Sequence, residues 1–341
     1  MTGYERIHSA FNDKKPDKVP IMLHNFMVAA REANVTMEQY RNDPKVIAEV
    51  FIRAVEKYRY DGVLVDIDTV TLAGACGVNV DFPVDDPARS HIGNLEDYSK
   101  LGTLKIPDLS KYKYSAIWLE ATRLLKEHFG DQISVRGNCD QSPFSLASMI
   151  RGTQNWMMDF YMAEGSLIFE LLDYCTEVTC QFVDLMAETG ADIISNGDSP
   201  AGPDMIPPEM YIKYALPYQK KVVQTAHKHK LPYVLHICGN TESILKEMLE
   251  TGADALELDY KTDVQKAFDL MSDKCAFIGN VDPSGVLALG TPGDVVSATE
   301  ALLKVFTKTN RFVLNAGCAL PPGTPEANLR AFIETARSFS N

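Results

Sequence analysis

The sequence predicts an α/β fold, a (β/α)8 TIM barrel, and three observations support this prediction. Short apolar runs rich in Val, Ile and Leu alternate with longer stretches of helical periodicity. Eight such runs occur, which is the number of strands in this barrel. Polar side chains follow the runs, as expected where strands end at the barrel mouth. A doubly wound open sheet is the alternative, but no Gly-x-Gly-x-x-Gly motif favours it.

The predicted strands are short and rich in branched apolar residues, which suit a sheet buried on both faces. In chain order they are residues 19–23, 62–67, 133–136, 191–195, 233–235, 253–258, 276–278 and 312–314. Each is separated from the next by enough chain for a helical crossover, as parallel strands require.

The predicted helices lie before and between these strands. An amphipathic segment at 4–12 forms an N-terminal extension, and Asp43 and Pro44 start a helix that runs to Tyr58. A long insertion with several prolines follows strand two. Further helices are expected at 114–129, in two segments between strands three and four with the second at 165–188, at 208–230, and from Thr324-Pro325 onward. The chain is interpreted as a single domain, residues 1–341.

The composition is that of a globular protein, with 45% hydrophobic and 23% charged residues. A net charge of −13 argues against binding of nucleic acid through its phosphates. No apolar run reaches membrane-spanning length and the N-terminus has no signal sequence, so we expect a cytoplasmic protein. Seven scattered cysteines do not resemble a disulfide framework. A homodimer is compatible with this composition.

Three soft metal ligands occur at two strand ends. Strand five runs into His236 and Cys238, and strand eight is followed by Cys318. In an extended strand alternate side chains share a face, so His236 and Cys238 are expected to point the same way. One imidazole and two thiolates suit zinc, and three protein ligands leave a fourth position open for catalysis. We therefore predict a zinc site in which Cys318 reaches the ion across the mouth.

Other polar residues are expected around the same mouth. The candidates for substrate binding are His24, Asn25, Asn138 and Asn196, and the candidates for catalysis are Asp68, Asp198 and Asp259. Aspartates after strands often cap the following helix, and for Asp140 and Asp282 capping or turn formation is favoured over catalysis. For Asp198 and Asp259 capping and function are equally favoured. Cys139 is a minor candidate for a fourth zinc ligand, since most cysteines are inert.

Two segments resemble a known family. His-Ile-Cys-Gly at 236–239 and Ala-Gly-Cys-Ala-Leu-Pro-Pro-Gly-Thr-Pro at 316–325 resemble the zinc-dependent corrinoid methyltransferases of the uroporphyrinogen decarboxylase superfamily. Gly-Asn-Val-Asp-Pro at 279–283 and Asp-Lys-Val-Pro at 17–20 extend the resemblance nearly end to end. It implies a TIM barrel, zinc on His236, Cys238 and Cys318, and acidic positions at Asp198 and Asp259 that support the zinc ligands or orient substrate.

The decarboxylases of the same superfamily match less well. The positions of their two substrate-gripping arginines correspond to Asn25 and Ala29, their tyrosine to Met149 and their late histidine to Cys318. Only their catalytic aspartate has a counterpart, Asp68. Because a substrate with many carboxylates needs cationic partners, uroporphyrinogen decarboxylation is the less favoured activity.

The resemblance implies transfer of a methyl group between methylcobalamin and a small thiol or methyl donor at the zinc. No segment resembles a cobalamin-binding domain with a D-x-H-x-x-G motif, so the corrinoid is expected on a partner protein. The direction of transfer stays open, with a slight preference for thiol methylation. The alternatives are a uroporphyrinogen decarboxylase, and a non-catalytic tetrapyrrole-binding barrel whose structural zinc has four protein ligands.

Overall fold

A barrel of eight parallel strands forms the centre of the molecule. The computed structural model describes residues 1–339, and its main sheet has the strand order β1-β2-β5-β6-β7-β8-β9-β10. The strands are β1 (Met22–Leu23), β2 (Gly62–Val65), β5 (Ser134–Gln141), β6 (Ile193–Gly197), β7 (Tyr233–Ile237), β8 (Ala255–Leu258), β9 (Ala276–Val281) and β10 (Phe312–Ala316). This architecture confirms the predicted α/β, TIM-barrel fold class.

The barrel is nearly closed between its first and last strands. Ile21 and Leu314 form a parallel bridge, and the Leu314 amide donates to the Pro20 carbonyl at 2.8 Å. The buried carboxylate of Asp61 reinforces this seam, because it accepts from the Ile21 amide and from Arg337 at 2.9 and 2.8 Å. It also accepts from Arg6 at 3.0 Å. One side chain therefore joins both ends of the chain to the first strand.

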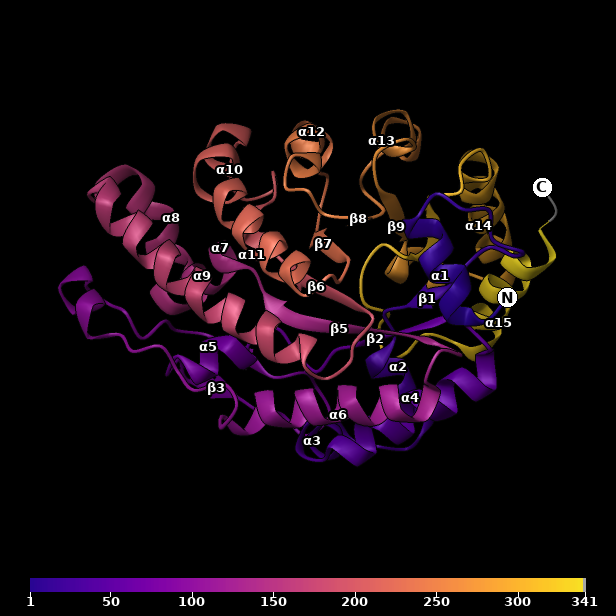
Figure 1. Ribbon diagram of the computed structural model, residues 1–341, viewed down its shortest axis with the longest axis horizontal. Helices are drawn as coiled ribbons and strands as arrows, with labels where there is room; N and C mark the ends of the chain where they lie inside the picture. Colours follow the sequence, from indigo (N-terminus) through magenta and orange to yellow (C-terminus); the bar gives the residue numbers. More distant parts are fainter. Residues whose placement is uncertain (340–341) are drawn as a thin grey trace.

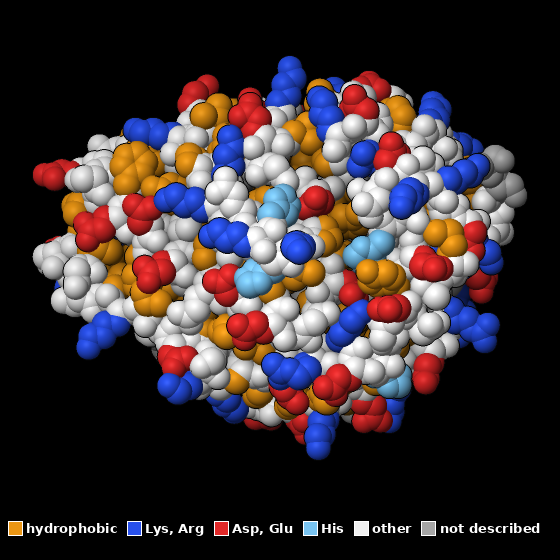
Figure 2. Space-filling view, viewed as in Figure 1, with side chains coloured by type: hydrophobic (Ala, Val, Ile, Leu, Met, Phe, Trp, Pro, Cys, Tyr) orange, Lys and Arg blue, Asp and Glu red, His pale blue; other side chains and the backbone are white. Residues whose placement is uncertain are grey.

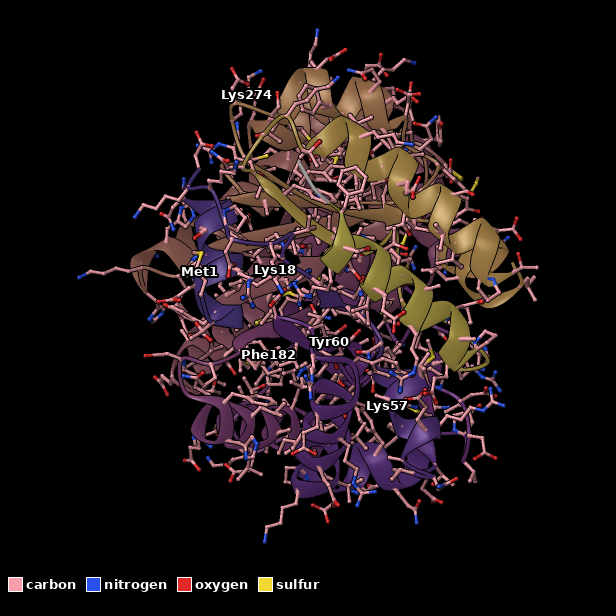
Figure 3. All side chains as sticks on the ribbon, turned by 90° about the vertical axis from the view of Figure 1, so that its right-hand side faces the viewer. Met1, Lys18, Lys57, Tyr60, Phe182 and Lys274 are labelled. Atoms are coloured by element: carbon pink, nitrogen blue, oxygen red, sulfur yellow. The ribbon has the colours of Figure 1, made fainter. Side chains whose placement is uncertain are left out.

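Helices surround the barrel (Figure 1). They are α1 (Gly3–Phe11), α2 (Phe26–Glu32), α3 (Met37–Asn42), α4 (Pro44–Tyr58), α5 (Thr71–Ala75), α6 (Lys113–Phe129), α7 (Pro143–Arg151), α8 (Thr153–Met162), α9 (Gly165–Ala187), α10 (Pro208–Tyr214), α11 (Leu216–Lys228), α12 (Leu245–Leu249), α13 (Val264–Met271), α14 (Pro292–Phe306) and α15 (Glu326–Ser338). The view turned by 90° shows α15 lying diagonally across one side of the molecule (Figure 3). None of the helices in residues 1–339 is both long and apolar enough to cross a membrane.

The N-terminal helix α1 closes one end of the barrel. Its side chains Ile7 and Ala10 pack against residues from the beginnings of the strands, including Met22 and Ala276. Figure 1 shows this helix, in indigo, in front of the strands. The predicted N-terminal extension is thus a plug, which leaves the opposite end of the barrel as the open mouth.

The insertion after β2 lies at that mouth. It contains α5, a hairpin of β3 (Val80–Asp81) and β4 (Arg89–Ser90), and the 3-10 helix η1 (Tyr98–Thr103). The buried guanidinium of Arg41 in α3 holds this segment by donating to the carbonyls of Pro83 and Asp86. These contacts set Pro87 against the central cavity.

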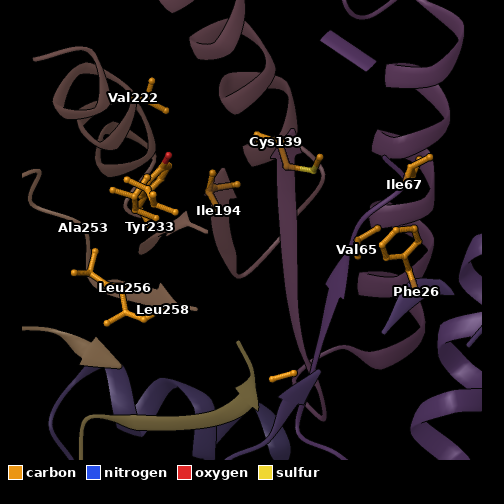
Figure 4. Packing of buried hydrophobic residues seen from close by; sticks show 14 of the residues in the cluster. Phe26, Val65, Ile67, Cys139, Ile194, Val222, Tyr233, Ala253, Leu256 and Leu258 are labelled. Carbon is orange, nitrogen blue, oxygen red and sulfur yellow. The ribbon is translucent and has the colours of Figure 1, made fainter. Parts of the chain in front are cut away.

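Apolar side chains on the outer face of the strands pack against the helices. Figure 4 shows Val65, Ile194, Leu256 and Leu258 within this cluster, together with Cys139. On the surface, acidic and basic side chains are interspersed, and the face seen in Figure 2 has no broad basic area.

Several strands extend further than the sequence predicted. The strands β5, β6, β7, β9 and β10 continue to Gln141, Gly197, Ile237, Val281 and Ala316, beyond the ends of the apolar runs. Consequently Asn138, Asn196 and His236 lie on strands and not just beyond them. The reason is that backbone pairing continues while alternate polar side chains point into the cavity at the mouth.

Three helix boundaries also differ from the prediction. Residues 208–230 form two helices, α10 and α11, because Pro217 fits only the first turn of a new helix. Three helices and not two follow β5, since Gly152, with φ of 81°, separates α7 from α8. The last helix begins at Glu326, and the Thr324 hydroxyl donates to the Pro321 carbonyl instead of capping it. The helix from Pro44 to Tyr58, capped by Asp43, is confirmed.

Candidate metal centre and its cavity

Three ligand side chains converge at the barrel mouth. His236 is on β7, Cys238 follows this strand, and Cys318 follows β10. His236 Nε2 lies 3.1 Å from Cys238 Sγ, and Cys238 Sγ lies 3.8 Å from Cys318 Sγ. Their ligand atoms all lie within 4.8 Å of one another, and this is the metal-type cluster found among residues 1–339. Two sulfurs bound tetrahedrally to one zinc at about 2.3 Å would be about 3.8 Å apart.

The orientation of His236 suits metal binding. Its Nδ1 lies 2.9 Å from the carbonyl oxygen of Glu257, on the neighbouring strand β8. A ring nitrogen can approach a carbonyl so closely only as a donor, so Nδ1 carries the proton. Nε2 then faces the sulfurs and can offer its lone pair to a metal that displaces its proton, which gives the usual arrangement of zinc-bound histidines.

Two glycines allow the cysteines to approach each other. Gly239 has φ of +88°, so the chain turns sharply after Cys238, and its amide donates to Asp259 at 2.9 Å. A Cβ on Gly317 would lie 2.4 Å from the amide nitrogen of Tyr260. The chain before Cys318 therefore packs directly on the loop after β8, which brings the second sulfur toward the first.

The three ligands strongly perturb one another's protonation. A hydrogen bond from the Cys318 thiol lowers the pKa of Cys238 to about 3, and the adjacent His236 adds to this effect. The same contact and burial raise the pKa of Cys318 well above its usual value. Burial lowers the pKa of His236, but the charge of Cys238 outweighs burial and raises it to about 10. Without a cation only one sulfur is charged, and a metal would stabilise both as thiolates.

A cavity of about 220 Å³ adjoins the three ligands. Its lining includes His24, Phe26, Asp66, Asp68, Arg136, Asn138, Gln141, Asn196, Ser199 and Glu257, together with His236, Cys238 and Cys318. The structure thus brings seven predicted site residues to one wall, four of them outside the ligand set and three within it, next to residues to which the sequence analysis gave no role. A cavity of this size suits a small organic molecule.

The predicted substrate-binding residues divide into two groups. His24, Asn138 and Asn196 line the cavity. His24 Nε2 and Asn138 Nδ2 contact the two carboxylate oxygens of Asp66 at 2.6 and 3.0 Å. By contrast, Asn25 is buried at the start of α2, outside the cavity lining, and its amide nitrogen lies 3.4 Å from the Tyr60 hydroxyl.

The predicted catalytic aspartates also differ in position. Asp68 lines the cavity, where its Oδ1 accepts from the Val70 amide and the Thr71 hydroxyl and its Oδ2 has no partner among residues 1–339. Burial raises the pKa of Asp68 to about 6. Asp198 and Asp259 lie outside the cavity lining.

Asp198 and Asp259 instead form hydrogen bonds with neighbouring loops and helices. Asp198 accepts from the amide and hydroxyl of Ser145 and from Gln219, at 2.6 to 2.9 Å. Asp259 accepts from the amides of Gly239 and Lys261 at 2.9 and 3.0 Å. Through Gly239, Asp259 therefore orients the turn that carries Cys238.

The remaining alternatives from the sequence are placed by the structure as follows. Asp140 accepts from the Leu72 amide and Asp282 from the amides of Ser284 and Gly285, so both cap helices. Cys139 is fully buried, with its sulfur 4.0 Å from the Phe182 carbonyl, and is not part of the metal-type cluster.

Sequence reasoning assigned no role to Arg136 and Glu257. These side chains form an ion pair across the barrel interior, with Nη2 and Oε2 2.5 Å apart and both residues almost fully buried. The available signal was a charged residue inside each of two apolar strands. Such charges are seldom buried without a partner of opposite sign.

A family model described as uroporphyrinogen decarboxylase matches residues 2–339. The chain belongs to the uroporphyrinogen decarboxylase family. Within this family, it is 31% identical to the methylcobamide:CoM methyltransferase MtbA of Methanosarcina acetivorans, over 99% of both chains. It is 27% identical to the uroporphyrinogen decarboxylase of Prochlorococcus marinus strain NATL1A, over 91% of this chain and 87% of the other.

The fold of this family member also matches a solved structure. A methyltransferase from Methanosarcina mazei superimposes with a TM-score of 0.88 at 22% sequence identity, covering 98% of each chain. This similarity confirms the barrel fold over nearly the whole chain. The predicted resemblance to the methyltransferase branch is likewise confirmed by the MtbA relatives.

Proposed function

We propose that this protein is a zinc-dependent methyltransferase that moves a methyl group between a corrinoid and a small thiol or methyl-donor substrate. The observation that carries the proposal is the convergence of His236 Nε2 and the sulfurs of Cys238 and Cys318 within 4.8 Å. The 31% identity to a methylcobamide:CoM methyltransferase supports the same chemistry. Zinc bound there would act as a Lewis acid toward a sulfur or other heteroatom.

The protein's own residues have defined tasks in this proposal. The carbonyl of Glu257 keeps the His236 proton on Nδ1, and Asp259 holds the turn after Cys238. The cavity beside the ligands receives the small substrate, with His24, Asn138 and Asn196 in its wall. For a thiol substrate, the sulfur would lose its proton to solvent and take the methyl group from cobalt, and the electron pair of the broken carbon–cobalt bond would remain with the corrinoid.

The corrinoid is proposed to arrive on a separate protein at the barrel mouth. A cavity of about 220 Å³ holds a small molecule but not a corrinoid ring, which has to approach from outside. The MtbA relatives act on a methylcobamide, as their name states, which supports a corrinoid-carrying partner.

Uroporphyrinogen decarboxylation is the rival activity, and one observation favours it. Asp68, the counterpart of the decarboxylase aspartate, lines the cavity. Its electrostatics argue the other way, because Arg136 is the one Lys or Arg among the lining residues and is already paired with Glu257. A substrate with many carboxylates would find little cationic support here.

Metal analysis tests the zinc site. The protein is expected to bind about one zinc per chain, and Cys238→Ala is expected to lose most of it, because two remaining ligands hold zinc poorly. Cys139→Ala is the matched control, since this buried thiol is outside the cluster and should retain the metal. Zinc retained equally in both variants would contradict the assignment.

A methyl-transfer assay tests the reaction. Zinc-loaded protein should demethylate methylcobalamin with some member of a panel of thiols, or methylate cob(I)alamin from methoxy compounds or methyltetrahydrofolate. Cys238→Ala should abolish the activity. Conversion of uroporphyrinogen in the presence of a chelator, with no methyl transfer, would support the decarboxylase instead.

A further inference from the structure

His24 and Asp66 form a hydrogen-bonded pair in the cavity wall. His24 Nε2 lies 2.6 Å from Asp66 Oδ2, and both side chains are largely buried. Asp66 Oδ1 accepts from the Ile67 amide at 2.9 Å and from the Asn138 side chain at 3.0 Å. Oδ2 is therefore the oxygen that serves the imidazole. Since an ionised carboxylate only accepts hydrogen bonds, the proton between the two side chains lies on Nε2.

The second ring nitrogen of His24 is open to the cavity. His24 lines the cavity, and its Nδ1 makes no hydrogen bond with residues 1–339 and is not among their enclosed polar atoms. Phe26, another lining residue, stacks on the ring with centroids 5.7 Å apart, which limits the rotation of the imidazole. With the proton on Nε2, the lone pair of Nδ1 is available to a molecule in the cavity.

Backbone contacts hold His24 beside the segment that carries Cys318. The Leu320 amide, two residues after Cys318, donates to the His24 carbonyl at 2.8 Å. The His24 amide donates at 3.1 Å to the side chain of Asn315, three residues before Cys318. The imidazole and the Cys318 sulfur therefore belong to neighbouring parts of one cavity wall.

We propose that His24 is a catalytic base for a thiol substrate and that Asp66 is its positioning residue. The inference rests on the proposed function, in which the thiol sulfur binds beside Cys238 and Cys318. The S–H bond breaks, its electron pair stays on the substrate sulfur, and the proton moves to His24 Nδ1. The resulting imidazolium lies against the Asp66 carboxylate, and the proton passes to solvent when the methylated product leaves.

The other acids of the cavity wall are less suited to this task. Glu257 is paired with Arg136 through Oε2 and accepts from Asn315 through Oε1. Asp68 has an unpartnered Oδ2 among residues 1–339, but its hydrogen bonds join it to the start of α5 and not to the segment around Cys318. Asp68 is therefore the rival base that the experiment has to exclude.

Counting protons during thiol binding tests the base without a turnover assay. 2-Mercaptoethanol is titrated calorimetrically into zinc-loaded protein at pH 7, in two buffers of different ionisation enthalpy. A simple thiol is protonated at this pH, so binding as a thiolate frees about one proton. The unaltered protein should release less than about half a proton, because His24 accepts it. Release of a full proton by the unaltered protein would overturn the proposal.

Single variants assign the proton to His24. His24→Gln should release about one proton per thiol bound, whereas Asp68→Asn should behave like the unaltered protein. The reverse pattern would overturn the proposal in favour of Asp68. His128→Gln is the matched control, since His128 is exposed in the last turn of α6 and its replacement should change nothing.

Asp66→Asn provides an independent test if His24→Gln does not fold. The oxygen of the new amide should stay with the two donors, Ile67 and Asn138, so that its NH2 group faces His24. Nε2 then becomes the acceptor and Nδ1 carries the proton, which removes the base without removing the ring. This variant should also release about one proton per thiol bound. Retention of the proton in Asp66→Asn would contradict the positioning role.

Methyl transfer from free methylcobalamin separates a base from a structural residue. With 2-mercaptoethanol, His24→Gln should be slower by about a hundredfold at pH 7. With 2,2,2-trifluoroethanethiol, a more acidic thiol that ionises more readily by itself, the loss should shrink to about tenfold or less. An equal loss with both thiols would show that His24 only holds structure.

The two proposals fail in different ways. Methyl transfer with full proton release by the unaltered protein would leave the proposed function intact and remove the base. Absence of both thiol binding and methyl transfer would remove the proposed function, and the base with it.

Discussion

Individual carboxylates in this protein differ in role because their hydrogen-bond partners differ. Asp66 is held by His24 and Asn138 in the cavity wall, and Asp259 is held by backbone amides beside Cys238. Asp198 is fully buried, its carboxylate accepts from Ser145 and Gln219, and burial raises its pKa to about 6. Aspartates after the strands β2, β6 and β8 thus have three different environments.

The buried carboxyl of Asp198 makes stability depend on pH. Since its pKa is raised from 3.8 to about 6 in the fold, its protonated form is favoured there, and this stabilisation is lost as pH rises through about 6. Relative to Asp198→Asn, the protein should lose on the order of 3 kcal/mol of unfolding free energy between pH 4 and 7. Thermal unfolding of both proteins across this range measures the difference.

Asp131→Asn is the control for this titration, because Asp131 has an 82% exposed side chain. This variant measures the effect of removing an exposed aspartate on the free energy of unfolding. A difference between Asp198→Asn and the unaltered protein that does not change with pH would show that the Asp198 carboxyl does not titrate abnormally.

At the level of elements, the barrel depends on a seam between its first and last strands. A single bridge, Ile21 to Leu314, joins β1 to β10, and β1 has only two residues. Asp61 compensates by accepting from the Ile21 amide and from Arg6 and Arg337 of the two terminal helices. The terminal helices α1 and α15 therefore contribute to the closure of the barrel.

Removing this carboxylate charge should weaken the seam. Asp61→Asn removes the ionic contacts to Arg6 and Arg337, and we expect a loss of about 2–3 kcal/mol, below the usual value for fully buried pairs because the arginines are partly exposed. Thermal unfolding measures it, with Glu49→Gln as the control, since the Glu49–Arg53 pair is exposed.

The same unfolding experiment also tests the prediction that residues 1–341 form one domain. Both variants should unfold in one transition, since α1, β1 and α15 are held together by Asp61. A separate early transition in Asp61→Asn would mean that the terminal helices unfold independently of the barrel.

On the scale of the whole molecule, exposed apolar residues follow the carboxyl ends of the strands. Ile92 belongs to the insertion after β2 and is 75% exposed, and Leu289 follows β9 and is 84% exposed. Val84, Met205 and Tyr260 lie in the segments after β2, β6 and β8. All these segments belong to the mouth end of the barrel, the end at which a corrinoid protein would have to dock.

This arrangement predicts an effect on docking that is separate from the chemistry. Ile92→Asp combined with Leu289→Asp should lower methyl transfer with the corrinoid protein about tenfold or more, while the reaction with free methylcobalamin is unchanged. Lys274→Glu is the control, because Lys274 precedes β9 at the opposite end of the barrel (Figure 3). Equal losses with both corrinoid forms would place the defect in the site itself and not in docking.

Much of this protein follows from local sequence patterns. The eight apolar runs, the Asp43-Pro44 helix start and the H-x-C spacing of His236 and Cys238 depend only on neighbouring residues, and the structure contains the corresponding strands, helix and paired side chains. Strand ends were predicted less well, because backbone pairing in β5 and β7 continues beneath polar side chains.

The tertiary structure alone decided which distant residues meet. It brought Cys318 to Cys238, paired Arg136 with Glu257, and placed Asp68 in the cavity wall while Asp198 and Asn25 lie outside it. These outcomes depend on the stagger and closure of the barrel, which determine the side chains that face the interior at each height. The sequence by itself determined that one histidine and two cysteines follow strands as candidate ligands. Barrel closure decided where these side chains meet, because closure depends on contacts between strands that are far apart in the chain.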